Sequence, residues 1–389
     1  MKYKLLCPIQ QPIKELPFQE KELHPLLDFL SNDLPITEST IFERGTITKE
    51  GKLDCCKQDL GAVGAGLLAN ALKENTHIKS ILFGTGGIGD EGAKQVAQLL
   101  QENQHIETVY LGCNYIEATG AAHLTQALTQ NKSVKALWLK RNPIGVEGAK
   151  NIANLLTQNQ QLKSLDLVNT HIGLEGLQAV CKVLIETQHP LERLYLSGNQ
   201  IDEKGAIALA ALLSNNTHLQ EILLSVNHLD DKGTSILAEG LSKNKTLKNL
   251  SLASNNIGNL GATVLFKALI QHPSLQKLDL GYSRSTKVLE AVSNKIGNEA
   301  MKTLKDLLAA NTSLYYLDLT RNQLTLKGLQ LIKEGLQHNT NLKTLLLGKG
   351  FQKKTLIPIK QRLEQNLSNN PTAVFQVHQD VKMIKSVYR

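Results

Sequence analysis

Aromatic residues and cysteines are both scarce in this sequence. Aromatics make up 4% of the 389 residues, and Trp138 is the single tryptophan. The five cysteines are odd in number and contain no C-x-x-C pair, which argues against a disulfide framework and against a zinc site. We therefore expect reduced thiols, no bound metal and a cytoplasmic location.

The sequence also lacks long apolar runs. No run approaches the roughly 20 residues that a membrane-spanning helix needs. Residues 1–21 contain no sustained apolar region of the kind found in a secretory signal peptide. We expect neither a membrane partner nor a signal peptide.

The net charge of +8 is unevenly distributed along the chain. Residues 349–389 contain eight Lys or Arg and two Asp or Glu, a balance of +6, so the other 348 residues carry only +2. A nucleic-acid-binding protein needs basic residues along its working surface. We therefore expect no nucleic-acid partner, and RNA binding through the basic tail remains an alternative that predicts salt-sensitive affinity.

One pattern repeats along most of the chain with a period of 28 residues. Its template is LxxLxLxxNxIxxxGxxxLxxxLxxN, and residues 191–218 are a clear example. A degenerate unit at 52–75 comes first, and the last unit, 342–350, is truncated. Steps between units are 28 or 29 residues except for one of 39 residues. The units begin at Ile78, Ile106, Val134, Leu162, Leu191, Leu219, Leu247, Leu275, Leu314 and Leu342.

Each unit changes its hydrophobic period partway along. The LxL segment alternates as a short strand does, and GxxxLxxxL repeats every four residues as a helix does. The asparagine between them can bond backbone groups of adjacent turns, and the glycine at the start of the helix allows close packing. Because one unit cannot bury its own apolar face, stacked units must share a core.

This template, with a full helix in every 28- or 29-residue unit, resembles the ribonuclease-inhibitor-like class of leucine-rich repeat proteins. The segment FERGTITKEGKLDCCKQDLG at 42–61 is similar to the start of leucine-rich repeat effectors of intracellular bacteria. The resemblance implies an α/β leucine-rich repeat solenoid, a horseshoe with a parallel sheet on the concave face and helices on the convex face. Vertebrate ribonuclease inhibitors are longer and cysteine-rich, so the resemblance does not extend to ribonuclease as the ligand.

We expect three domains: an N-terminal cap at 1–49, a solenoid of about ten to eleven units at 50–350, and a C-terminal cap at 351–389. PLLDFLSNDLPITEST in the first cap predicts a short helix followed by turns. In the last cap, TLIPIKQRLEQNLSNN predicts a helix and AVFQVHQDVKMI a closing strand. The caps would cover the apolar ends of the repeat array.

The sequence offers no convincing motif for catalysis or cofactor binding. GTGGIG at 84–89 satisfies the dinucleotide-binding fingerprint, but Gly89 recurs as Gly145 and Gly258, so repeat register explains it. No HxxxH or HExxH spacing occurs, and no Ser/His/Asp arrangement can be assigned. Bacterial ubiquitin ligases with leucine-rich repeats carry a nucleophilic cysteine after the repeats, and none follows here. We expect no catalysis and no cofactor.

The outward strand positions are the ones that the repeat leaves variable. Alternation points Leu137 and Leu139 inward and Trp138 outward to solvent, with Tyr110 beside it on the neighbouring strand. Aromatics and arginine resemble the composition of protein–protein hot spots; alternatively, the rings merely stack to cover the sheet. The candidate protein-binding residues are Tyr110, Trp138, Lys140, Arg141, Asp166, Arg193, Tyr195, Asp279, Tyr282, Arg284, Tyr316, Asp318 and Arg321.

The eleven extra residues of the 39-residue unit lie within 281–297. An insertion there should emerge at a loop edge beside the concave face, and insertions on one face often mark the binding side. Tyr282, Arg284 and Lys287 favour contact with a partner. A neutral surface loop is the alternative.

These features predict an interaction module that grips a folded protein partner with the concave face and the 281–293 loop. The resemblance to ribonuclease inhibitor implies an enzyme partner, a host protein or another bacterial effector, whose active site is covered. The resemblance to effectors implies delivery into a host cell. The alternative is a GTPase-activating protein similar to the activator of the Ran GTPase, a family with an acidic tail where this chain has a basic one. We expect a monomer in the absence of the partner.

Overall fold

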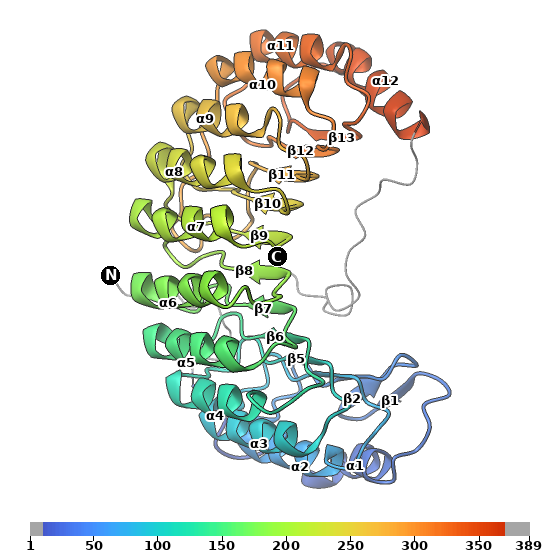
Figure 1. Cartoon of the computed structure of the whole chain (residues 1–389). Coiled ribbons are helices and arrows are strands. Elements are labelled where there is room, and N and C mark those ends of the chain that lie inside the picture. Colours follow the sequence, from blue (N-terminus) through green and yellow to red (C-terminus); the bar gives the residue numbers. More distant parts are fainter. Residues whose placement is uncertain (1–10, 370–389) are drawn as a thin grey trace. The chain divides into compact units, whose positions relative to one another are not determined.

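The computed structural model describes residues 11–369. These residues form two compact units, 11–191 and 192–369, and the boundary coincides with the repeat that begins at Leu191. Short strands alternate with helices in each unit (Figure 1). Within this described part of the chain, no helix is both long enough and apolar enough to span a membrane.

The first unit begins with an antiparallel segment and continues as a parallel sheet. Strands β1, β2 and β3 pair antiparallel, with Ile41 opposite Thr46 and Ile47 opposite Leu53. Strands β3 to β7 pair in parallel in chain order. The elements are η1 (Glu20–Glu22), α1 (His24–Ser31), β1 (Thr40–Phe42), β2 (Gly45–Ile47), β3 (Lys52–Asp54), α2 (Gly61–Leu72), β4 (Ser80–Leu82), α3 (Gly89–Glu102), β5 (Thr108–Tyr110), α4 (Ala118–Leu128), β6 (Ala136–Trp138), α5 (Gly145–Gln158), β7 (Ser164–Asp166) and α6 (Gly173–Glu186).

The second unit repeats one strand and one helix throughout. Strands β8 to β13 pair in parallel in chain order. The elements are β8 (Arg193–Tyr195), α7 (Glu203–Asn215), β9 (Glu221–Leu223), α8 (Asp230–Lys243), β10 (Asn249–Ser251), α9 (Asn259–Leu269), β11 (Lys277–Asp279), α10 (Asn298–Ala310), β12 (Tyr316–Asp318), α11 (Leu326–Leu336), β13 (Thr344–Leu346) and α12 (Lys353–Asn369).

In each unit the helices pack against one face of the unit's own sheet, and the core lies between these two layers (Figure 1). Central strand residues such as Leu137 and Leu278 are completely buried, because alternation points them toward the helices. Neighbouring helices approach through small residues: a Cβ added at Gly240 in α8 would lie 2.5 Å from the carbonyl oxygen of Ala210 in α7. One helix per parallel strand confirms the predicted α/β leucine-rich repeat architecture.

The asparagine that follows most of the parallel strands links adjacent repeats, as the sequence predicts. Asn142 Nδ2 donates to the carbonyl oxygens of Leu111 and Leu139 at 2.8 and 2.9 Å. Its Oδ1 accepts the backbone N–H groups of Asn114 and Ile116 at 2.8 and 3.1 Å. Because Asn142 is fully buried, these bonds satisfy backbone groups that would destabilise the fold if they were left unpaired.

A second asparagine ladder, which the sequence-based expectations did not include, follows the helix ends. Asn131 Nδ2 donates to the carbonyl oxygens of Leu100 and Asn103 at 2.8 and 3.1 Å. Its Oδ1 accepts two backbone N–H groups of the following loop at 3.0 and 2.9 Å. His189 and His272 take the equivalent place in two repeats, so this ladder tolerates histidine as well as asparagine.

Two of the predicted cap elements are confirmed. The short helix expected near the N-terminus is α1, and the helix expected after the last repeat is α12. The closing strand predicted from AVFQVHQDVKMI lies outside the described residues.

The 39-residue repeat places its extra residues between β11 and α10, in a segment of turns. Thr286 Oγ1 donates to Ser254 Oγ at 2.6 Å. The backbone N–H of Asn256 donates to the carbonyl oxygen of Val292 at 3.0 Å. These contacts attach the insertion to the loop between β10 and α9, so it lies at the strand-to-helix edge that the sequence predicts.

Candidate functional site

The outer strand face of each unit is formed by the first and third residues of its strands and points away from the helices. In the first unit this face carries Tyr110 at the end of β5 and Trp138 at the end of β6, which are paired in register. Their ring centroids lie 6.4 Å apart with the planes inclined by 53°. The two rings are therefore direct neighbours, as strand pairing predicts.

The prediction that Trp138 is open to solvent is wrong. Its side chain is 2% exposed, and that of Tyr110 is 7% exposed. Side chains opposite each other on neighbouring strands lie about 5 Å apart and cover one another's flanks. Tyr110 also leans across two glycines: a Cβ at Gly112 would lie 2.9 Å from its hydroxyl oxygen, and one at Gly84 would overlap its ring. Burial raises the pKa of the Tyr110 hydroxyl.

The charged candidates of the first unit are buried as well. Lys140 and Arg141 follow β6, and Asp166 ends β7. Asp166 Oδ1 accepts the backbone N–H of Val168 at 2.9 Å, and the backbone N–H of Arg141 donates to the carbonyl oxygen of Val168 at 2.8 Å. Asp166 and the Arg141 backbone thus take part in the turns after their strands. All three side chains contribute little exposed charge to the outer face of the first unit.

Strand β8 of the second unit also has a covered outer face. Tyr195 and Arg193 are both buried. The Nη1 atom of Arg193 lies 3.2 Å from Oε2 of Glu192. The aromatic and arginine candidates on this strand therefore do not form an exposed surface, contrary to expectation.

The outer face is more accessible at β11 and β12. Asp279, Tyr316 and Asp318 are half-buried, and strand register pairs Lys277 with Tyr316 and Asp279 with Asp318. Lys277 Nζ lies 5.0 Å from the centroid of the Tyr316 ring, which is a cation–π geometry. The structure thus brings three predicted binding residues together on two adjacent strands.

A second cation–π pair extends this surface beyond the strand ends. Arg321 Cζ lies 4.2 Å from the centroid of the Tyr282 ring. Tyr282 and Arg321 each follow their strand by three residues, so the pair continues the row of Asp279 and Asp318. Arg284, in the insertion, is exposed. We call the following six residues the β11–β12 cluster: Lys277, Asp279, Tyr282, Tyr316, Asp318 and Arg321.

The surroundings of Asp279 disfavour its charged form. Burial raises the pKa of its carboxyl group, and the nearby charge of Asp318 raises it further. Hydrogen bonds from the Gly281 N–H and the Ser251 hydroxyl, both at 2.9 Å, act in the opposite direction. Two carboxylates on neighbouring strands create a negative potential that a cation between them would neutralise.

Three polar residues in or near this cluster were not predicted from the sequence. Glu221 begins β9 and Lys277 begins β11, and burial raises the pKa of Glu221. The Ser251 hydroxyl lies 2.6 Å from the Ser225 hydroxyl and donates to Asp279. Glu221, Ser251 and Lys277 all occupy outward positions of the repeat, and that position is the signal that could have identified them.

The GTGGIG segment is packed against the chain itself. The backbone N–H of Ile13 donates to the carbonyl oxygen of Gly87 at 2.9 Å. A Cβ at Gly87 would lie 2.5 Å from the Ile13 side chain, and one at Gly89 would lie 2.8 Å from Pro12. These glycines therefore serve close packing. Across residues 11–369, no group of three or more His, Cys, Asp or Glu is arranged to hold a metal ion.

Comparison with known proteins identifies the class of repeat. The family model described as Leucine Rich repeat matches residues 130–153, 158–181, 187–210, 243–266 and 310–333. Together with the alternation of parallel strands and helices, these matches show that the chain contains leucine-rich repeats. No match is found among curated proteins.

Two solved structures share a limited likeness with this chain. Actin-binding site 2 of leiomodin-1 is 22% identical with a TM-score of 0.35, and the match covers 42% of this chain and 87% of that one. The C-terminal domain of Caenorhabditis elegans tropomodulin is 18% identical with a TM-score of 0.34, and the match covers 42% of this chain and 94% of that one.

Proposed function

We propose that this chain is a protein-binding module whose second unit contacts a folded partner through the β11–β12 cluster. The observation that carries the proposal is the pairing of Asp279 with Asp318 at half-buried positions on adjacent strands. A lysine or arginine of the partner between these carboxylates would relieve their repulsion and form charge-assisted hydrogen bonds. Tyr316, Tyr282 and Arg321 add the residue types that dominate interface hot spots.

We further propose that the partner is an enzyme and that binding covers its active site. The support is the resemblance of the repeat template to the ribonuclease-inhibitor-like class. An enzyme with basic groups at the rim of its active site would dock on the cluster, and inhibition would be steric. The insertion at 281–293 would contact the same partner, and no chemical step is required of this chain. The partner would be a host enzyme or another effector, met after delivery into a host cell.

The test starts with the full chain as bait, and captured proteins are identified by mass spectrometry. Each purified candidate is then titrated calorimetrically. Asp279→Asn combined with Asp318→Asn should weaken binding at least about tenfold, because a hot-spot residue contributes roughly 2 kcal/mol. Asp306→Asn, at an exposed position of α10, removes a charge outside the cluster and serves as the matched control.

The inhibition step has a separate readout. The activity of a captured enzyme should fall in proportion to added chain and reach its minimum at equimolar ratio. Unchanged affinity of the double variant would refute the cluster as the contact surface. Full enzyme activity in the saturated complex would refute inhibition.

A further inference from the structure

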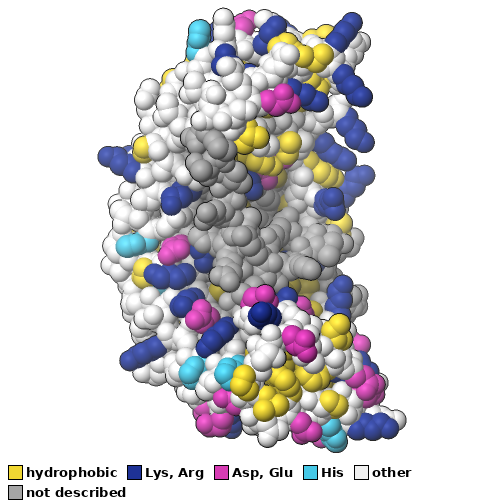
Figure 2. Space-filling view, turned by 90° about the vertical axis from the view of Figure 1, so that its right-hand side faces the viewer, with side chains coloured by type: hydrophobic (Ala, Val, Ile, Leu, Met, Phe, Trp, Pro, Cys, Tyr) yellow, Lys and Arg dark blue, Asp and Glu magenta, His cyan; other side chains and the backbone are white. Residues whose placement is uncertain are grey.

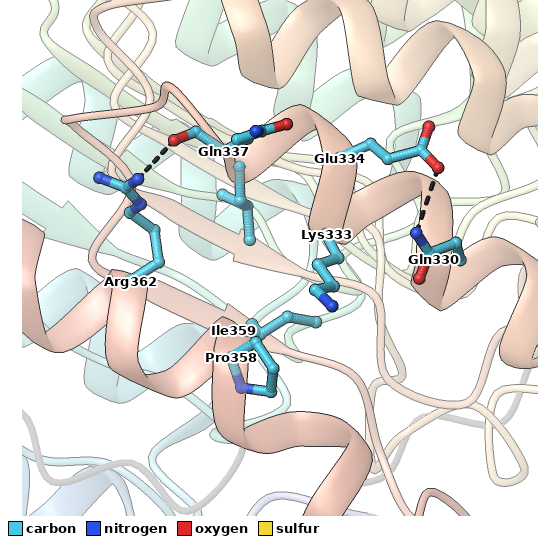
Figure 3. A pocket seen from close by; sticks show the side chains of 8 residues that line it. Gln330, Lys333, Glu334, Gln337, Pro358, Ile359 and Arg362 are labelled. Carbon is cyan, nitrogen blue, oxygen red and sulfur yellow. Dashed lines mark hydrogen bonds between the residues drawn. The ribbon is translucent and has the colours of Figure 1, made fainter.

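Helices α11 and α12 of the second unit enclose a groove of about 330 Å³ (Figure 3). Leu336, Pro358 and Ile359 form its apolar part. Its polar lining consists of Gln330, Lys333, Glu334, Gln337 and Arg362. This volume is at the small end of the range for ligand-binding pockets, so the groove has room for a few side chains of a peptide.

The single carboxylate in this lining is directed away from the apolar part. Glu334 Oε1 accepts a hydrogen bond from Gln330 Nε2 at 3.2 Å, and Glu334 Oε2 lies 3.7 Å from Lys305 Nζ. Figure 3 shows that the Lys333 side chain extends toward Ile359, whereas Glu334 extends toward Gln330. Lys333 therefore brings a positive charge to the apolar floor.

Arg362 supplies a second cation, and its helix is firmly attached to the last repeat. Its Nη2 donates to the carbonyl oxygen of Gln337, which engages one of the five N–H donors of a guanidinium group. One turn further along α12, buried Asn366 donates to the carbonyl oxygen of Leu342 at 2.8 Å. Ile359 is buried as well. These contacts hold both walls of the groove in place.

The surroundings of the groove are also basic. Residues 321–369 contain nine Lys or Arg and two Asp or Glu. In Figure 2, Lys and Arg side chains (dark blue) outnumber acidic ones (magenta) in the upper part of the view, where Figure 1 places α11 and α12. Such a field attracts acidic partners and raises their association rate.

We propose that this groove binds a short acidic peptide segment of a partner protein. A glutamate or aspartate carboxylate would lie between Lys333 and Arg362, and an adjacent leucine-like side chain would pack on Pro358 and Ile359. Charge complementarity selects an acidic segment, and the apolar floor requires an apolar side chain next to the carboxylate. A nucleic-acid phosphate would meet the cations but would leave the apolar floor exposed. The site is separate from the β11–β12 cluster and does not rest on the function proposed for it.

Fluorescence anisotropy with fluorescein-labelled peptides and the full chain tests this site. The peptide LELEL should bind, and LQLQL and EEEEE should bind at least about fivefold more weakly, since each lacks one of the two contacts. Lys333→Met retains the apolar stem and should weaken LELEL binding about fivefold. Lys327→Met, which removes an exposed charge from the same helix, is the matched control and should leave binding unchanged.

Four outcomes would overturn the proposal. Equal binding of LELEL and LQLQL would show that charge does not select the ligand, and EEEEE binding as tightly as LELEL would show general electrostatic attraction. An equal effect of Lys333→Met and Lys327→Met would place the peptide outside the groove. Gln330→Trp fills the groove without changing its charge and should abolish LELEL binding, so that retained binding would also refute the site.

Discussion

Replacing His272 by asparagine should stabilise the protein at acidic pH. His272 takes an asparagine position in the ladder at the helix ends, and its side chain is 4% exposed. Its Nδ1 accepts the backbone N–H groups of Leu275 and Ser274 at 3.1 and 3.4 Å. An imidazole that accepts through Nδ1 is neutral and donates only through Nε2. Asparagine there would accept the same N–H groups and could donate as Asn131 does.

The size of the effect follows from the proton affinity of His272. Burial lowers its pKa from 6.5 to about 4, because desolvation disfavours the imidazolium. Between these pH values the unfolded chain binds a proton that the folded protein does not, so stability falls as the pH drops through this window. The difference in pKa corresponds to about 3 kcal/mol in the free energy of unfolding, of which about 2 kcal/mol is lost by pH 5.

Urea denaturation at about pH 7.5 and about pH 5 measures this effect. Between the two, the wild-type chain should lose about 2 kcal/mol more stability than His272→Asn. Circular dichroism is the suitable probe because the single tryptophan, Trp138, belongs to the first unit and His272 to the second. His105→Asn removes an exposed histidine and is the matched control. Equal pH dependence of wild type and His272→Asn would refute the reasoning.

Three further substitutions test helix packing in both units and a half-buried charge in the second unit. Gly240→Ala should lower the free energy of unfolding by about 1–3 kcal/mol, because its methyl group would overlap the backbone of Ala210. Gly66→Ala should raise the free energy of unfolding by about 0.5–1 kcal/mol, since a Cβ there would lie no closer than 3.4 Å to its nearest neighbour. Denaturation curves in which both glycine variants shift stability in the same direction would contradict these two predictions. Glu221→Gln should raise the melting temperature at neutral pH. Burial raises the pKa of Glu221, which means that its ionised carboxylate destabilises the folded state. That gain should shrink as the pH falls through the folded-state pKa, and calorimetric scans showing a constant gain would contradict it.

Repetition explains why the asparagines of the ladders and the residues of the core could be predicted from the sequence. Every repeat meets a neighbour with the same template, so a residue type that recurs every 28 residues faces the same contact each time. Asn142 and Asn114 illustrate this, because each bonds backbone groups of the turn before it. The asparagines at the helix ends, such as Asn131, also bond backbone groups of the preceding repeat. The last asparagine of the template is the feature of the sequence that predicts them.

The candidate site was less predictable because exposure is not a periodic property. Strand alternation correctly placed Tyr110 and Trp138 on the outer strand face, but both rings are buried. The room for the Tyr110 ring comes from Gly84 and Gly112, which lie in different repeats. The fit of such a ring depends on the size of side chains about one repeat away, and those sizes vary between repeats.

Local patterning was thus sufficient to predict the strand, the helix and the inward leucines of each repeat, because these depend on neighbours a few residues away. The pairing of Asp279 with Asp318 depends on the 39-residue spacing and on strand register. The groove beside Lys333 depends on how α12 docks on α11. These features arise from contacts between segments distant in the sequence, and only folding brings their charges and apolar surfaces close enough to act together.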